Sequence, residues 1–228
     1  MIIDYSNLDI KDVKAHNISE TEMFYKLSSY MMNGFTMFHN LIIANCTSGI
    51  ETLHIITGGV LFIKRIHFEN FNSERLGNMK CAFMSHNMLE EINIEALDTS
   101  NVTDMSHMFQ DCKKLKSLNL TRMNTSKVCS MVGMFKNCCN LEKLDLSSFD
   151  TRNVEYINLM FSGCTNLRFI DLSSLNLMNI KSQSRQDHVF DHCYSLRRII
   201  LPKDKDTRNK IYNMIKCSSI DIYNIDLV

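Results

Sequence analysis

The stretch Asn101-Val-Thr-Asp-Met-Ser-His-Met-Phe109-Gln-Asp-Cys112-Lys-Lys-Leu115-Lys-Ser-Leu118-Asn-Leu120 decides the fold, because its pattern recurs along the chain. Its phenylalanine has counterparts at a constant interval of 26 residues, which are Phe83, Phe135 and Phe161. A period of roughly 20 to 50 residues is typical of stacked repeat proteins, in which each unit buries its apolar face only against its neighbours. The chain is therefore predicted to form a solenoid.

Other positions of the repeat recur with the same period, and we call each set of equivalent positions a column. Three residues after each phenylalanine stand His86, Cys112, Cys138 and Cys164, and a leucine follows three residues later. The pattern resumes at Phe190 after a step of 29 residues, which indicates a three-residue insertion in the last unit. One period before the first clear unit, Ile63, Ile66 and Phe68 indicate a degenerate unit.

Each unit combines two kinds of spacing. Leu118 and Leu120 alternate with polar residues, which predicts a short strand. Val128, Met131 and Phe135 are spaced by three and four residues, which predicts a short helix. Hydroxyl residues before this segment are expected to cap the helices; they are Thr99, Ser100, Thr125, Ser126 and Thr151. The predicted fold class is α/β, with a parallel sheet on one face of the solenoid and short helices on the other.

The segments outside the repeats are expected to cap the two ends. Residues 1–48 are predicted to form a helical N-terminal cap, with a capping box at 19–22 and a second helix over 35–44. Residues 49–201 hold the repeats. Residues 202–228 are predicted to form a C-terminal cap, with a helix over 206–217 and a final strand near Ile220 and Ile222.

Charge and cysteine content restrict the class of protein. Basic and acidic residues number 25 each, so the net charge is zero and nucleic acid is not expected as the main partner. No apolar run reaches the ~20 residues of a membrane span, and the first residues do not resemble a secretory signal. Four of the nine cysteines share one repeat column. This favours buried free thiols and a reducing, cytoplasmic setting, although the stacking distance alone also permits disulfides.

Three segments resemble BspA-type leucine-rich repeats: Leu144-Asp-Leu-Ser-Ser-Phe-Asp-Thr-Arg-Asn-Val154, Asn101-Val-Thr-Asp-Met-Ser-His-Met-Phe109 and Ser162-Gly-Cys-Thr-Asn-Leu167. The resemblance covers about residues 63–201. It implies a leucine-rich-repeat solenoid with strands on one face and short helices on the other, and it implies no activity. Many members of that family are surface proteins or adhesins, so a surface or secreted adhesin-like protein is the alternative to an intracellular module.

The outward strand positions are the candidate binding surface. A column at the strand starts alternates in sign, and we interpret it as mutual neutralisation of stacked neighbours; it reads Lys64, Glu90, Lys116, Glu142 and Arg168. Phe169 is an aromatic residue at an outward position, next to Arg168, Arg197 and Arg198. Exposed aromatic and arginine side chains often anchor interfaces. The predicted binding residues are Phe169, Arg168, Arg198, Arg197, Asp171, Lys143 and Asp145.

No motif indicates catalysis or a cofactor. His188, His192 and Cys193 are close in sequence, but the repeat places Cys193 in the buried column and His192 at a solvent turn, whereas a zinc site needs four ligands. We therefore expect no metal, and a non-catalytic module that binds a protein or peptide through the outward strand face. An adhesin-like surface protein is one alternative, and an enzyme or metal-binding protein centred near His188 is another.

Overall fold

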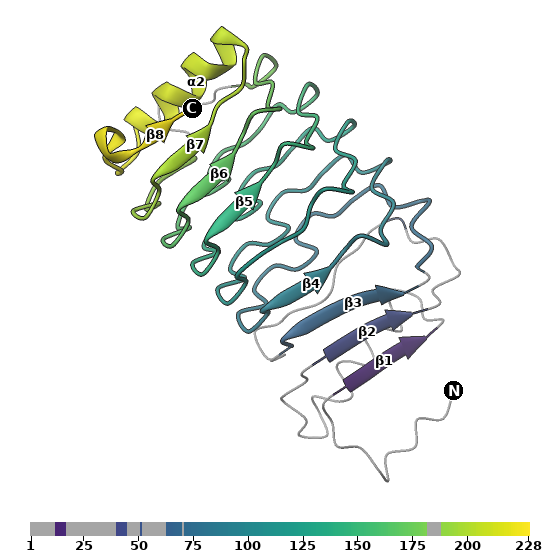
Figure 1. The fold of residues 1–228 in the computed structure, drawn as a ribbon. Helices are drawn as coiled ribbons and strands as arrows, with labels where there is room; N and C mark the ends of the chain where they lie inside the picture. Colours follow the sequence, from purple (N-terminus) through teal and green to yellow (C-terminus); the bar gives the residue numbers. More distant parts are fainter. Residues whose placement is uncertain (1–11, 17–39, 45–50, 52–62, 70, 182–187) are drawn as a thin grey trace.

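The computed structural model describes residues 12–16, 40–44, 51, 63–69, 71–181 and 188–228. These residues form two four-stranded parallel sheets, in which strands follow one another in chain order (Figure 1). The first sheet comprises β1 (Asp12–His16), β2 (Asn40–Ala44), β3 (Arg65–Glu69) and β4 (Glu91–Asn93). The second comprises β5 (Lys143–Asp145), β6 (Phe169–Asp171), β7 (Arg198–Ile200) and β8 (Asp226–Leu227).

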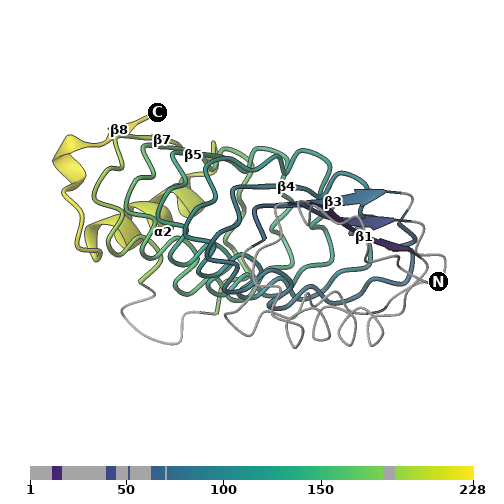
Figure 2. The ribbon, with the colours of Figure 1, turned by 90° about the horizontal axis from the view of Figure 1, so that it is seen from below.

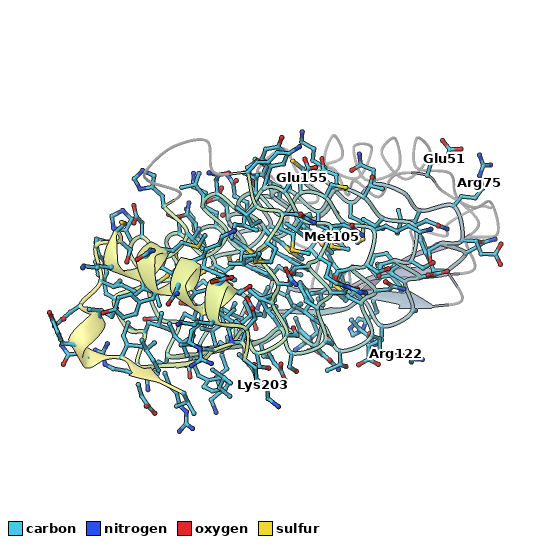
Figure 3. The ribbon with its side chains drawn as sticks, turned by 90° about the horizontal axis from the view of Figure 1, so that it is seen from above. Glu51, Arg75, Met105, Arg122, Glu155 and Lys203 are labelled. Atoms are coloured by element: carbon cyan, nitrogen blue, oxygen red, sulfur yellow. The ribbon has the colours of Figure 1, made fainter. Side chains whose placement is uncertain are left out.

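The strands form one side of the solenoid and the segments that connect them form the other (Figure 2). The buried apolar side chains form one core cluster. The second residue of each repeat strand is buried, as predicted from the alternation; these residues are Ile66, Ile92, Leu144, Ile170 and Ile199, each at most 6% exposed. The repeated phenylalanines stack ring upon ring along the molecule. Successive centroids lie 5.3 to 5.9 Å apart over Phe83, Phe109, Phe135, Phe161 and Phe190. In Figure 3, Met105 lies in this interior, and Arg122 and Lys203 lie on the strand side.

The short helices predicted opposite the sheets are wrong. The segments 78–85, 104–111, 130–137 and 156–163 consist of turns, and we call them the turn ladder. Parallel bridges join Asn78, Asp104, Ser130 and Tyr156 across successive units. Between these bridges, Met105 N donates to Ser130 O and Met131 N to Tyr156 O, at 2.9 and 2.8 Å. The amides therefore bond to the next unit rather than within a helix.

Left-handed backbone explains why no helix forms there. His107, Gly133 and Leu159 have φ of 58°, 57° and 59°, and the residues four positions later are also left-handed; these are Asp111, Asn137 and Gly163, with φ of 62°, 59° and 80°. A residue with positive φ interrupts the i to i−4 bonding of an α-helix. Glycine, asparagine and aspartate tolerate this conformation best, so their presence at several of these positions was the signal in the sequence.

The threonines expected to cap helices join neighbouring units instead. Thr125 Oγ1 donates to Asp150 O at 3.0 Å and accepts from Asp150 N at 2.8 Å. Thr99 and Thr151 make the same pair of bonds to Asn124 and Asn176. Each of the three threonines is at most 2% exposed. The buried hydroxyl groups thus satisfy main-chain groups of the following unit.

The N-terminal segment departs from the predicted helical cap. Residues 40–44, expected to be helical, form strand β2, which pairs in parallel with β1 and β3. The strand spacing of the repeats continues here without their leucine and phenylalanine signature, and for this reason the sequence reading missed it. The sheet therefore crosses the expected boundary at residue 48. The rest of the predicted helical cap, including the capping box at 19–22, lies outside the described residues.

The C-terminal helix is confirmed. Helix α2 (Lys205–Lys216) begins at Asp204, whose side chain accepts from Thr207 N, and it buries Ile211 and Ile215 against the core. A 3-10 helix, η1 (Ile222–Asn224), precedes β8, so the last strand comes after the position predicted for it. Within the described part of the chain, no helix has the length and apolar character needed to cross a membrane.

The strand predicted around Leu118 is absent. Residues 115–120 pair with neither β4 nor β5, and the main chain of 116–119 makes no backbone hydrogen bond to any other described residue. Leu118 is partly buried, whereas its counterpart Leu144 is 1% exposed. A groove of about 240 Å³ lies beside this unit, lined by residues 91–95 with Ser117 and Asn119. The strand layer is therefore interrupted where the turn ladder continues.

Candidate interaction surface

Three outward residues form a row across the second sheet. Lys143 of β5 lies opposite Phe169 of β6, and Phe169 lies opposite Arg198 of β7. Lys143 and Arg198 are exposed, and Phe169, which the sequence presented as an exposed aromatic residue, is partly buried. Neighbouring strands lie about 4.8 Å apart. A cationic side chain therefore stands on each side of the aromatic residue.

Arg168 and Arg197 lie at the starts of β6 and β7. Arg197 N donates to Arg168 O at 3.0 Å, which places the two residues side by side. Both side chains are exposed, and among the described residues neither has a carboxylate within 4 Å. Arg197 Nη1 donates instead to the carbonyl oxygens of Tyr194 and Leu196, at 3.1 and 2.8 Å. Two like charges are thus adjacent, and no carboxylate of the described residues lies within ion-pair distance of either.

Asp145 and Asp171 form the next row and pair in register. Each carboxylate accepts a hydrogen bond from the amide two residues later, Ser147 N or Ser173 N, both at 2.8 Å. The hydrogen bonds from the side chain and then the backbone of Ser147 lower the pKa of Asp145. These bonds stabilise the turns that follow the strands. The structure therefore brings all seven predicted residues together and gives the two aspartates a structural contact.

The alternating column at the strand starts is only partly ion-paired. Lys64 Nζ lies 4.0 Å from Glu90, and in the adjacent outward column Arg65 Nε lies 3.5 Å from Glu91. The two later cations of the alternating column, Lys116 and Arg168, make no ion pair within the part of the chain that the structure describes. Mutual neutralisation, expected along the whole column, thus describes its N-terminal end.

Two features of this surface were missed in the sequence. Arg198 Nε lies 3.7 Å from Asp226 Oδ2 of β8, a residue outside the repeat period that no column could have indicated. Tyr194 is 56% exposed and its hydroxyl hydrogen-bonds to His192 Nδ1. Other units place Lys113, Cys139 and Thr165 at the position of Tyr194, so an aromatic residue there was a usable signal.

The residues near His188 do not assemble into a metal centre. His188 Nδ1 pairs with the Asp191 carboxylate, and His192 bonds to the Tyr194 hydroxyl. Cys193 is 0% exposed, and its Sγ donates to Phe161 O at 3.1 Å. Across the described ranges, no group of three or more histidine, cysteine or acidic residues is placed to hold a metal ion.

The cysteine column is buried, as predicted, and its thiols are free. Each Sγ donates to the phenylalanine carbonyl of the preceding unit at 3.1 to 3.2 Å; the cysteines are Cys112, Cys138, Cys164 and Cys193. Burial raises the pKa of all four thiols, that of Cys193 to about 12. These groups stay protonated at neutral pH and behave as core residues.

The profile of a family described as "Mycoplasma protein of unknown function, DUF285" matches residues 61–201, more than half of the chain. No curated protein matches the sequence. Among solved structures, the chain is similar to the crystal structure of a TLR13–ssRNA13 complex, at 12% identity and a TM-score of 0.24, over 83% of this chain and 36% of that one. The match over 61–201 shows that the chain belongs to the family described as Mycoplasma protein of unknown function, DUF285.

Proposed function

We propose that this chain is a BspA-type leucine-rich-repeat solenoid that works as a non-catalytic interaction module. Its partner is a protein or peptide that binds the outward face of β5, β6 and β7. The observation that carries this proposal is the row Lys143, Phe169 and Arg198, which places an aromatic residue between two cations on the outer side of a parallel sheet.

Core packing does not require an aromatic side chain at Phe169. The inward residue of the same strand, Ile170, is 0% exposed and already closes the core. The outward neighbours in register are charged, as expected for a surface that faces water. Covering the exposed part of the ring with a partner is favourable by about 25 cal/mol per Å² of apolar surface. Aromatic and arginine residues together are the usual centre of a binding surface.

The turn ladder supports recognition by holding this face in one geometry. Backbone hydrogen bonds of 2.7 to 2.9 Å link segment 130–137 to 156–163, and that segment to residues 189–191. A surface that is already ordered loses little conformational entropy on binding.

We place the module in a reducing compartment. Cys129 and Cys217 are exposed and carry free thiols. Such thiols persist where the cell keeps cysteine reduced and become oxidised outside it. Thiol counting on protein isolated under denaturing, alkylating conditions should find all nine cysteines as thiols. Oxidised Cys129 or Cys217 in freshly isolated protein would contradict this assignment and favour the surface alternative.

Affinity capture from native lysate tests the interaction itself. Wild-type protein is compared with a Phe169→Ala/Arg198→Ala variant and with a control, Arg65→Ala/Glu91→Ala, which removes an ion pair from the first sheet. Proteins lost from the capture with the first variant and retained with the control are the expected partners, and their affinities are then measured with purified components. An affinity for a verified partner that both variants leave unchanged would overturn the proposed surface.

A further inference from the structure

We propose that the partner segment is acidic and carries an aromatic or aliphatic side chain next to its carboxylates. This inference rests on the proposed function and adds the chemistry of the partner to it. The site is a basic-aromatic cluster, which we define as Lys143, Arg168, Phe169, Tyr194, Arg197 and Arg198.

The cations of this cluster are short of internal partners. Arg168 and Arg197 are adjacent, and neither they nor Lys143 has a carboxylate within 4 Å in the described residues. Arg198 alone makes an ion pair, with Asp226 at 3.7 Å, and its side chain is still 52% exposed. Like charges on neighbouring strands repel each other. An anionic group placed between Arg168 and Arg197 would relieve that repulsion and accept hydrogen bonds from both guanidinium groups.

The acidic side chains around the cluster leave the arginines without an ion pair. Glu142 stands beside Arg168 at the strand starts, because Arg168 N donates to Glu142 O at 2.9 Å, but among the described residues its carboxylate is not within 4 Å of a cation. Asp145 and Asp171 each accept an amide hydrogen bond within the following turn, which holds them in the row beyond Phe169. The adjacent pair Arg168 and Arg197 is therefore flanked by carboxylates that stand apart from it.

The aromatic residues define the apolar part of the ligand. Phe169 is partly exposed, and Tyr194, whose carbonyl holds Arg197 Nη1, is 56% exposed. The row from Lys143 to Arg198 spans two strand spacings, about 10 Å. An extended peptide covers that distance in about three residues. The carboxylates of the partner should therefore stand within three residues of its apolar anchor.

A peptide fits this surface better than a nucleic acid does. The cationic area at the strand starts covers β6 and β7 and is bordered by Glu142, Asp145 and Asp171, which repel a phosphate backbone that continues past the arginines. The whole chain carries no net charge, whereas nucleic-acid surfaces are strongly basic. A short segment with a few carboxylates makes use of the cations and stops before the aspartates.

Selection from a random library of 12-residue peptides displayed on phage tests the inference directly. Immobilised full-length protein is the bait, and selected peptides are resynthesised for titration. Two matched variants are used: Arg197→Gln/Arg198→Gln in the cluster, and Lys64→Gln/Arg65→Gln, which neutralises the equivalent positions at the start of β3. Circular dichroism melting of each variant checks that it is folded.

We expect selected peptides to be enriched in aspartate and glutamate within three residues of an aromatic or aliphatic residue. The cluster variant should weaken their binding about tenfold or more, as expected for the loss of two close charges, and the control should change it less than twofold. Peptides that require Phe169 but carry no acidic residues would overturn this inference and leave the proposed function standing. Tighter binding of a thymidine 20-mer than of any peptide would also overturn it. Selection of no peptide sensitive to Phe169→Ala would overturn both proposals.

Discussion

The turn ladder and the strand face differ although the same repeat builds both. The turn ladder runs without interruption through Asn78, Asp104, Ser130 and Tyr156. The strand face is divided at residues 115–120, which form no strand and pair with neither β4 nor β5. The two sides are opposite edges of the same units (Figure 2). The stack is therefore held together mainly at its turns.

This difference shows where the sequence is free to vary. On the turn ladder, left-handed backbone, close contacts between units and stacked phenylalanine rings constrain each residue. On the strand face, outward residues contact mainly their neighbours in register and water. Substitutions there change charge and shape at little cost in stability. A binding surface is thus carried by the side that the repeat leaves least constrained.

A matched pair of phenylalanine substitutions gives the largest expected contrast. Phe135 is 0% exposed and stacks between Phe109 and Phe161, at 5.8 and 5.9 Å. Phe135→Ala should lower the free energy of unfolding by about 3 to 5 kcal/mol, because it opens a cavity in the stack. Phe169→Ala on the strand face should cost less than about 1 kcal/mol. Urea denaturation of both variants measures the two values. Equal losses of stability would show that the strand face is as constrained as the phenylalanine stack.

Substitution of two glycines tests the backbone of the turn ladder. Gly163 has φ of 80°, and a Cβ there would overlap Asn137 Oδ1 and lie 3.3 Å from Asn137 Cα. Gly163→Ala should therefore cost about 2 to 3 kcal/mol through strain and overlap. The control is Gly77→Ala, where the nearest atoms to a new Cβ are 3.8 to 4.0 Å away. It should leave stability unchanged or raise it by about 0.5 kcal/mol, as read from thermal denaturation.

Alkaline pH should lower the stability of the folded protein through the buried cysteine column. The Cys193 thiol has its pKa raised by burial from 9.0 to about 12. Between these values the unfolded chain loses this proton and the folded chain keeps it, so rising pH favours unfolding. The contribution is complete below pH 9 and is lost progressively between pH 9 and 12, by about 1.4 kcal/mol per pH unit. The free energy of unfolding is measured between pH 9 and 12 by denaturation in the presence of a phosphine reductant. It should fall less steeply with pH in Cys193→Ala than in the wild type, by about this amount. Equal pH dependence in the two proteins would contradict the raised pKa of Cys193.

The interruption of the strand layer predicts the smallest difference in stability between two matched variants. Leu118 and Leu144 occupy the same column, but Leu118 is partly buried and Leu144 is 1% exposed. Leu144→Ala should cost about 2 to 4 kcal/mol, and Leu118→Ala about 1 kcal/mol less, because less apolar surface is lost from the core. Urea denaturation compares them. A loss at Leu118 equal to that at Leu144 would show that the strand layer is closed there in solution.

Sequence periodicity identified most inward residues correctly, but it assigned helices to the turn ladder and a strand to residues 115–120, and the structure has neither. Val128, Met131 and Phe135 are all 0% exposed, as their spacing predicted. The same spacing also fits a chain of turns with left-handed residues between them. Apolar spacing reports which side chains face the core, whereas the hydrogen-bond partner of each amide depends on how close the next unit stands. The predicted helices were wrong for that reason.

The sequence predicted which residues form the candidate surface, but it did not predict their ion pair or their hydrogen bonds. Register alone brings Lys143, Phe169 and Arg198 into one row, because the repeat aligns equivalent residues once the three-residue insertion before Phe190 is counted. The ion pair of Arg198 with Asp226 comes from β8, which follows a helix and has no place in the period. The amide bonds to Asp145 and Asp171 depend on the turn geometry after each strand.

The sequence by itself determined the repeat, the inward columns of phenylalanine, leucine and cysteine, and the row in which Phe169 stands. These follow from spacing alone, since stacking equal units places equal positions above one another. Only the tertiary structure decided that amides of the turn ladder bond between units, that β2 extends the sheet toward the N-terminus, and that the strand layer is interrupted at residues 115–120. Those features depend on distances between units, and a distance of that kind is set by packing on every side of the chain rather than by the order of residues within one unit.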